Sequence, residues 1–291
     1  MSLDKDPKTV RIALPKGRMF DQVVGLLNGA GISIRNSERG YRPNISLPNF
    51  DAKILKPRNV ISMIAAGARD IGFAGEDWIQ ETNTELVELL DTELNPVRLI
   101  VAAPHQILEN GKLPNRKIVI ATEYPNLAQN WVTANQLDAD ILQTYGATEV
   151  FPPEDADCII DNTATGSTLR ANGLAIIDEI MKSSTRFYAS KSAMDNENIR
   201  PQIDNLVMLI QSVLQARGRV MMDLNVAQEK LESVLGCLPS MRTPTVSPLS
   251  DSGWVAVRAA IPRKQLAEII PQLKLAGACD IVTTSAEQLI P

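Results

Sequence analysis

Apolar positions before residue 186 follow two alternating patterns. Short apolar runs that end at Gly, Pro or charged residues predict strands, and apolar residues three or four positions apart predict helices. The expected strands are 10–14, 54–55, 70–74, 85–90, 98–103, 117–121, 140–144, 158–160 and 175–181, and the expected helices are 21–29, 60–66 and 122–131. Strands that alternate with helices are typical of an α/β sandwich around a mainly parallel sheet.

The pattern changes after a long amphipathic helix expected at 198–218. The rest of the chain predicts strands at 220–225, 244–249, 254–261 and 280–284, and helices at 227–238 and 263–276. This βαββαβ order is the ferredoxin-like plan, and we expect it to form a small separate domain. None of its turns resembles a chemical site, which favours a regulatory or assembling role over a catalytic one.

The polar turns of the first part all follow predicted strands. Ligands of open α/β sheets bind outside the carboxyl ends of the strands, and two sub-domains with a cleft between them would gather such turns. The turns of interest are 15–18, 56–58, 75–77, 122–125 and 161–168.

Composition narrows the classes of function. The chain has 291 residues, of which 44% are hydrophobic and 22% are charged, as in soluble globular proteins. Its net charge of −5 argues against a protein devoted to nucleic acid. No apolar run approaches the roughly 20 residues of a membrane span, and the polar start MSLDKDPKTV lacks the apolar region of a signal peptide. We therefore expect no nucleic-acid or membrane partner.

Thiol and imidazole groups are few. Cys158, Cys237 and Cys279 share no CxxC spacing, which fits a reduced cytoplasmic compartment. The single histidine, His105, is interpreted as an ordinary loop residue, and a catalytic base is the alternative. Unless His105 is that base, most Ser-His and Cys-His hydrolase mechanisms are excluded, as are His-rich metal sites.

The most informative stretch is DCIIDNTATGSTLRANG at 157–173. An apolar strand runs into Asp161, small polar residues surround Gly166, and a helix is expected to follow. Unsatisfied N–H groups at a helix N-terminus attract anions, and small residues let a phosphate reach the backbone, so 164–168 can hold a monophosphate. Asp161 would repel that phosphate and fits ribose hydroxyls or a magnesium ion instead. The alternative is an ordinary helix N-cap with Asp161 at a strand end.

Two basic turns follow other strands. Lys16 and Arg18 flank a glycine, and Lys56-Pro57-Arg58 repeats the arrangement at a second strand end. These cations can neutralise a pyrophosphate or triphosphate, or they can be solvated surface charges. The glycine-containing segment 72–77 can admit a flat ring or a ribose, with close backbone packing as the alternative.

Several segments together resemble the long form of ATP phosphoribosyltransferase, the family that begins histidine biosynthesis. The matching segments are LPKGR at 14–18, KPRNV at 56–60, GARDIGFAGED at 67–77, IATEYPNL at 120–127, GATEV at 146–150, DNTATGSTLRANGL at 161–174, RTPTVSPL at 242–249 and LKLAGACDIVTTS at 273–285. The resemblance covers nearly the whole chain, and the segment at 161–174 is the most specific.

The resemblance implies a fold and a reaction. The implied fold is a two-lobed catalytic part like a periplasmic binding protein, with lobe I at 1–103 and 186–217, lobe II at 104–185, and a ferredoxin-like regulatory domain at 218–291. The implied reaction joins ATP to phosphoribosyl pyrophosphate with Mg²⁺, giving N1-(5-phosphoribosyl)-ATP and pyrophosphate. The family implies dimers or hexamers and inhibition by histidine.

Roles for individual residues follow as hypotheses, with Asp161, Arg18 and Lys16 as candidate catalytic residues. Asp161 is assigned to ribose hydroxyls or magnesium, and the metal ligands are left undetermined. The residues assigned to the 5-phosphate are Thr163, Ala164, Thr165, Gly166, Ser167 and Thr168. The others are Lys16, Arg18 and Arg58 for the pyrophosphate or the ATP phosphates, and Gly75, Glu76, Asp77 and Glu149 for the nucleotide side of the cleft.

The chain departs from the family pattern at a few positions. Asn59 stands where many relatives carry Asp, and Asn162 and Thr163 replace apolar residues. We expect the first to alter a contact near the cleft and the others to change strand packing. Two rival classes stay open: a non-catalytic solute-binding protein with the same two-lobed fold, and a subunit that kept the fold and lost activity.

Overall fold

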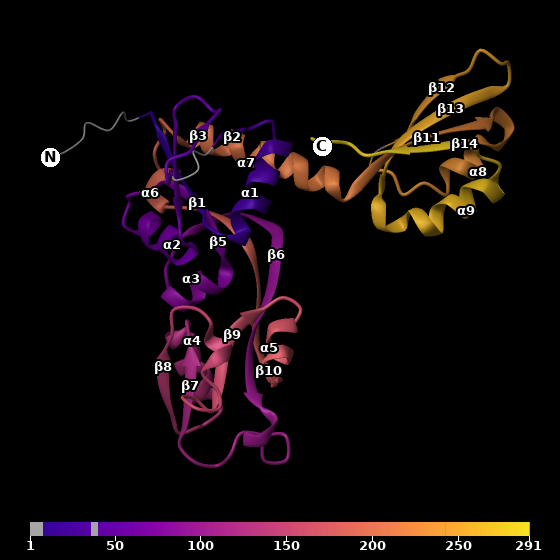
Figure 1. The fold of residues 1–291 in the computed structure, drawn as a ribbon. Helices are drawn as coiled ribbons and strands as arrows, with labels where there is room; N and C mark the ends of the chain where they lie inside the picture. The colour runs from indigo at the N-terminus through magenta and orange to yellow at the C-terminus, as the bar shows by residue number, and fades with distance from the viewer. Residues whose placement is uncertain (1–7, 36–39, 242, 291) are drawn as a thin grey trace. The chain divides into compact units, whose positions relative to one another are not determined.

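The computed structural model describes residues 8–35, 40–241 and 243–290 (Figure 1). These residues form two compact units. The first comprises the chain up to Gly25 together with Ser33–Ile203, and the second comprises Leu26–Ile32 together with the chain from Asp204 onward.

One eight-stranded sheet, counted over the described residues, organises the first unit. In spatial order its strands are β4 (Phe50–Leu55), β1 (Val10–Pro15), β5 (Ile71–Gly75), β10 (Leu174–Ala189), β6 (Val87–Pro104), β9 (Cys158–Thr163), β7 (Ile118–Thr122) and β8 (Ala139–Gln143). The outer pairs β4–β1, β1–β5, β9–β7 and β7–β8 are parallel. The expected mainly parallel sheet is wrong at its centre, because β5–β10, β10–β6 and β6–β9 pair antiparallel.

Strands β6 and β10 are the long ribbons that lie side by side in Figure 1. The course of β6 differs from the strands predicted for this region. The apolar pattern predicts two strands separated by residues 91–97, yet β6 continues through that run. Glu93 and Asn95 adopt positive φ there, and the ladder with β10 shifts register at Thr185. Side-chain bonds hold this bulged region, because Thr92 Oγ1 donates to the Thr185 carbonyl at 2.5 Å and Asn95 Nδ2 donates to Thr185 Oγ1 at 3.0 Å.

Helices connect these strands, and proline fixes where two of them begin. Pro57 and Pro125 occupy first-turn positions of α2 and α4, where a missing N–H costs nothing. The expected turn at 75–77 opens a further helix, α3, which the apolar pattern did not predict. The helical elements before residue 218 are α1 (Arg18–Gly29), α2 (Pro57–Ala65), α3 (Glu76–Thr82), α4 (Pro125–Ala134), α5 (Ser167–Ala171), α6 (Lys191–Met194) and α7 (Arg200–Arg217), with short 3₁₀ turns η1 (His105–Ile107) and η2 (Thr148–Val150). Most of α7 belongs to the second unit.

The core of the first unit lies where the strands are apolar on consecutive positions. Phe73 of β5 and Phe187 of β10 are fully buried partners across the ladder, with ring centroids 4.3 Å apart. Gly72 beside them is a packing position, since a Cβ there would lie 2.8 Å from the Ala13 carbonyl oxygen. A separate short pair, β2 (Ile34–Arg35) and β3 (Asn44–Ile45), completes the unit.

The second unit confirms the expected ferredoxin-like order. Its elements are β11 (Arg219–Ala227), η3 (Gln228–Lys230), α8 (Leu231–Leu235), β12 (Thr245–Pro248), β13 (Trp254–Pro262), η4 (Arg263–Gln265), α9 (Leu266–Ala276) and β14 (Cys279–Thr284). The sheet order is β12-β13-β11-β14, with every pair antiparallel. Alternate β11 residues are buried, which gives the sheet one apolar face. The helix expected at 227–238 is shorter, because the α-helix there spans only Leu231–Leu235. The boundaries of lobe I, lobe II and the regulatory domain stay predictions.

Across the described residues, no helix combines the length and apolar character that crossing a membrane would require.

Candidate active site

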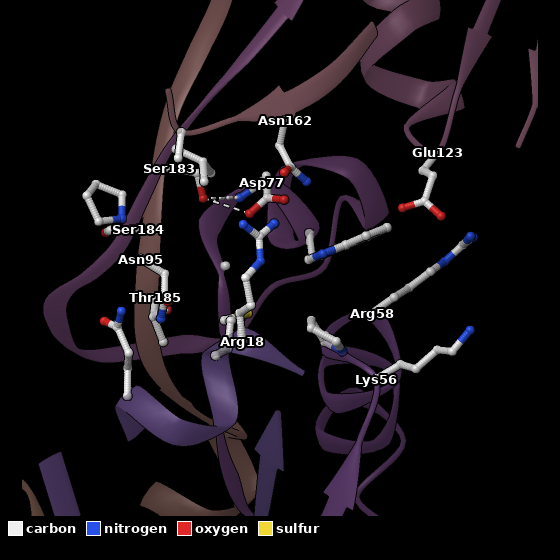
Figure 2. Close-up of a pocket in the computed structure, with 18 of the residues that line it drawn as sticks. Arg18, Lys56, Arg58, Asp77, Asn95, Glu123, Asn162, Ser183, Ser184 and Thr185 are labelled. Carbon is white, nitrogen blue, oxygen red and sulfur yellow. Dashed lines mark hydrogen bonds between the residues drawn. The ribbon is translucent and has the colours of Figure 1, made fainter. Parts of the chain in front are cut away.

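A cavity of about 1140 Å³ lies in the first unit (Figure 2). Its walls come from the start of α1, the β4–α2 turn, α3, the middle of β6 and β10, and the ends of β7, β8 and β9. The lining residues are Arg18, Met19, Asp21, Gln22, Lys56, Pro57, Arg58, Asn59, Gly75, Asp77, Trp78, Asn95, Pro96, Val97, Glu123, Thr144, Tyr145, Asn162, Ala164, Ser183, Ser184 and Thr185. Segments distant in the sequence therefore meet around one space of ligand size.

One wall of the cavity is cationic. Figure 2 shows Lys56 and Arg58 extending side by side toward Glu123, and Arg18 pointing into the space beneath Asp77. Burial raises the pKa of Glu123, and the charges of Lys56 and Arg58 partly oppose that rise. The Arg58 guanidinium carbon also lies 5.9 Å from the Trp78 ring centroid, which restrains it by cation–π attraction. This wall suits the phosphates of a nucleotide or a pyrophosphate.

A buried polar network borders the opposite wall. Asp77 accepts hydrogen bonds from Ser183 Oγ at 2.7 Å and from the Tyr124 hydroxyl at 2.6 Å. Asn162 Nδ2 donates to the same hydroxyl at 2.7 Å. Burial and the neighbouring Asp77 carboxylate raise the pKa of Tyr124 well above its usual value, so the phenol stays protonated. A Cβ at Gly75 would collide with the Asp77 carboxylate, which explains the glycine before α3.

Asp161 lies inside a strand, which corrects the expectation that it ends one. Strand β9 continues to Thr163, and Asp161 pairs with Ile100 of β6. Burial raises the pKa of Asp161 to about 6, against the opposing effect of the Asn162 amide, which donates to Asp161 Oδ1 at 2.6 Å. The carboxylates of Glu123 and Glu149 add to the rise. A largely buried carboxylate with two acidic neighbours is suited to bind a cation or to accept hydrogen bonds from hydroxyl groups.

We predict that Asp161→Asn changes stability with a distinctive pH dependence. The pKa of Asp161 rises from 3.8 unfolded to about 6 folded, so its stabilising contribution is complete below pH 4 and is lost as pH rises through 6. The variant should therefore be more stable than the wild type at pH 8, by about 3 kcal/mol at most, and similar at pH 4. Urea unfolding at the two pH values measures this.

Asp157→Asn is the matched control, with the opposite sign. Although burial acts against it, the ion pair with Arg116 and the Val119 amide lower the pKa of Asp157. That variant should lose stability at pH 8 and little at low pH, because a lowered pKa stabilises only above the unfolded value. Equal losses at both pH values for Asp161→Asn would contradict the burial argument.

The loop 163–168 has the local geometry of a tight turn into α5. Gly166 adopts φ +71°, and its amide donates to Thr163 Oγ1 at 3.0 Å. The Ser167 amide donates to Thr165 Oγ1 at 3.4 Å. Over the described ranges, the amides of Ala164, Thr165 and Thr168 have no protein acceptor. Those three amides remain able to bind an anion.

The sequence-derived candidates divide into two groups. The cavity brings together Arg18, Arg58, Gly75, Asp77 and Ala164. The remaining loop residues, with Asp161, Lys16, Glu76 and Glu149, do not line it.

Two candidates outside the lining have other partners. Lys16 Nζ donates to the Tyr41 hydroxyl at 3.0 Å and lies 5.0 Å from that ring's centroid. Glu76 forms an ion pair with Arg186 at 2.6 Å. Their roles at the site stay predictions.

The cavity also uses residues that the sequence reasoning did not single out. Ser183, Ser184 and Thr185 come from the middle of β10, and Asn95 comes from the bulged part of β6. The hydroxyl run was a visible signal, but it lay beyond the predicted end of its strand at residue 181. Glu123 lay in a turn of interest without an assigned role.

The described residues contain no group of three or more His, Cys, Asp or Glu side chains arranged to hold a metal. Mg²⁺ is commonly bound by one or two carboxylates together with substrate phosphates. The acidic surroundings of Asp161 are compatible with that mode of binding, in which Asp161 and Glu149 would be the protein ligands of an ion that arrives with its phosphates.

Comparisons with known proteins point to one enzyme family. The family model described as "ATP phosphoribosyltransferase" matches residues 56–212, and the one described as "HisG, C-terminal domain" matches 216–288. The ATP phosphoribosyltransferase of Chlorobium phaeobacteroides is 33% identical over 99% of this chain and 100% of its own length. That of Pelotomaculum thermopropionicum is 34% identical over 97% and 99%. The solved ATP phosphoribosyl transferase (HisG:HisZ) complex from Thermotoga maritima superposes with a TM-score of 0.64 at 25% identity, over 71% of this chain and 99% of that chain.

Proposed function

The chain belongs to the ATP phosphoribosyltransferase family and is a transferase of histidine biosynthesis, and from this premise we propose the reaction at its cavity. The enzyme transfers the phosphoribosyl group of phosphoribosyl pyrophosphate to N1 of ATP, giving N1-(5-phosphoribosyl)-ATP and pyrophosphate. The observation that carries the proposal is the meeting of Arg18, Arg58 and Ala164 around one cavity, where two anionic substrates can be held together.

The nucleophile needs little activation. The N1 lone pair of adenine is free at neutral pH, so no strong general base is required. This agrees with a cavity lining that contains no histidine. The protein instead has to align two substrates, which is worth on the order of 7–11 kcal/mol at best.

The difficult step is departure of pyrophosphate from C1 of the ribose. The sugar acquires oxocarbenium character while negative charge develops on the leaving group. Arg18 and Arg58 stabilise that charge from the cationic wall, and Lys56 adds to it. When bound, Mg²⁺ would add electrostatic stabilisation of the leaving phosphates.

The ribose 5-phosphate is held at the loop 163–168. The free amides of Ala164, Thr165 and Thr168 donate to its oxygens, and Gly166 provides the turn that directs them together. Asp161 accepts hydrogen bonds from ribose hydroxyls or binds Mg²⁺. At pH 7 it is mostly ionised, because its pKa is about 6.

The second unit is assigned to regulation and assembly. Its described residues contribute nothing to the cavity lining, so its effect on activity has to be indirect. We assign to it inhibition by histidine and formation of a homo-oligomer, a dimer or hexamer. The enzyme works in the cytoplasm, in keeping with its three free cysteines.

A single assay tests the proposed function. Purified protein with ATP, phosphoribosyl pyrophosphate and Mg²⁺ is expected to release pyrophosphate, to stop when EDTA removes Mg²⁺, and to slow when histidine is added. No release of pyrophosphate would sink the enzyme proposal and favour the solute-binding alternative. Release that ignores histidine would remove only the regulatory assignment.

A further inference from the structure

Glu81 is a buried carboxylate that the proposed chemistry does not use. It lies in α3 with 1% of its surface exposed. Its oxygens accept hydrogen bonds from the backbone amides of Asn126, at 3.2 and 3.1 Å, and of Leu127, at 3.0 Å, in the first turn of α4. The Asn126 side-chain amide donates back to the Glu81 carbonyl at 2.8 Å. Reciprocal bonds thus join the end of α3 to the start of α4.

Helix α4 has no cap of its own. Its N-cap residue, Tyr124, makes no side-chain capping bond, and Pro125 has no N–H. The amides of Asn126 and Leu127 would otherwise lack acceptors in a partly buried place. A carboxylate at this end also interacts favourably with the helix dipole. Glu81 therefore supplies the capping acceptor that the N-cap residue of α4 lacks, from an element about 45 residues earlier in the chain.

Of the two residues directly before this capped turn, one lines the cavity and the other contacts two residues that line it. Glu123 lines the cavity opposite Lys56 and Arg58 (Figure 2). Tyr124 donates to Asp77 at 2.6 Å, and its ring stacks on Trp78 with centroids 4.7 Å apart. Asp77 and Trp78 are α3 residues, as is Glu81. Residues of α3 thus hold the segment 124–127, and Glu81 is the α3 residue that contacts the first turn of α4.

We propose that Glu81 is a positioning residue for the phosphoribosyl transfer. It fixes the first turn of α4, and through that turn it fixes Glu123 and Tyr124 against the cationic wall of the cavity. This inference rests on the proposed function for its kinetic consequence. The competing explanation is that Glu81 only stabilises the fold, as any buried helix cap does.

Kinetics of Glu81→Ala and Glu81→Gln separate the two explanations. Loss of alignment at a distance from the chemistry can cost about 100-fold in rate, so Glu81→Ala should lower kcat/KM for ATP by about that factor, mostly through kcat. Glu81→Gln keeps one acceptor oxygen and should recover part of the loss. All assays use protein shown to be folded by circular dichroism.

Ser190→Ala is the matched control. Ser190 is a buried cap that accepts a bond from the Ala193 amide of α6 at 3.1 Å, and it does not line the cavity. We expect it to lower the thermal midpoint while kcat and KM stay at wild-type values. If folded Glu81→Ala behaves like Ser190→Ala, Glu81 is a structural cap and the inference is overturned.

Amide hydrogen exchange tests whether Glu81 positions this segment without using an activity assay. The Tyr124 amide donates to Thr122 Oγ1 at 2.9 Å, so loss of Glu81 does not remove its partner. Positioning predicts faster exchange at Tyr124 as well as at Asn126 and Leu127 in Glu81→Ala. Unchanged protection at Tyr124 would contradict it. A wild type that released no pyrophosphate would refute the proposed function and leave this readout valid.

Discussion

A Gly166→Val variant is expected to bind phosphoribosyl pyrophosphate at least about 100-fold more weakly than the wild type while keeping its fold. Gly166 adopts φ +71°, where a β-branched residue is strained. An added Cβ would lie 3.2 Å from Arg170 Nη1 and 3.8 Å from Ile176 Cδ1. The loop would relax by turning its amides, and losing even two charge-assisted hydrogen bonds, at about 1.5–3 kcal/mol each, accounts for the effect. Titration calorimetry measures the dissociation constant.

Gly111→Val is its control. Gly111 has φ +79° with no atom within 4 Å of an added Cβ, and it lies in the Glu109–Lys112 turn, away from the cavity lining. The backbone strain is comparable, so both variants should lose similar stability. Only Gly166→Val should lose substrate affinity. Normal affinity in Gly166→Val would remove the phosphate assignment of the loop.

Arg18→Ala is expected to lower kcat for pyrophosphate release by about 100- to 1,000-fold. Arg18 begins α1 after Gly17, whose φ of +83° turns the chain sharply at the end of β1. The turn brings the guanidinium into the cavity (Figure 2), where charge develops on the leaving group. In the alanine variant, Arg58 and Lys56 remain on the cationic wall to stabilise that charge. Because the interaction strengthens in the transition state, kcat should fall more than KM rises.

Lys117→Ala separates this effect from a general loss of positive charge. Lys117 pairs with Asp140 at 2.8 Å on the surface, with both side chains more than half exposed. Exposed ion pairs are screened by water and contribute little, so stability and turnover should change little. Comparable activity losses in the two variants would mean that net charge, and not the place of Arg18, governs turnover.

The C-terminal unit could be predicted from the sequence because one face of its sheet is buried. Val220, Met222 and Leu224 alternate with less buried residues along β11, and that period identifies a half-buried strand. The catalytic part could be predicted less well. Its central strands carry polar residues in their interiors, so the apolar pattern divides β6 at residues 91–97 and ends β10 eight residues early.

Part of the site was visible to sequence reasoning for a local reason. Arg18, Arg58 and Ala164 lie in turns that contain glycine or proline, and such turns are recognisable without the fold. Ser183 and Asn95 depend on the pairing of two long strands. The contact of Glu81 with Asn126 depends on how α3 packs beside α4. Contacts between residues so far apart in the sequence cannot be read from local patterns.

A crystal structure of the enzyme with phosphoribosyl pyrophosphate bound tests the central claim most directly. The account predicts the 5-phosphate oxygens within hydrogen-bond distance of the Ala164, Thr165 and Thr168 amides, with the pyrophosphate toward Arg18 and Arg58. A clearly bound substrate whose 5-phosphate lies elsewhere, with those amides turned to protein carbonyls, would contradict it.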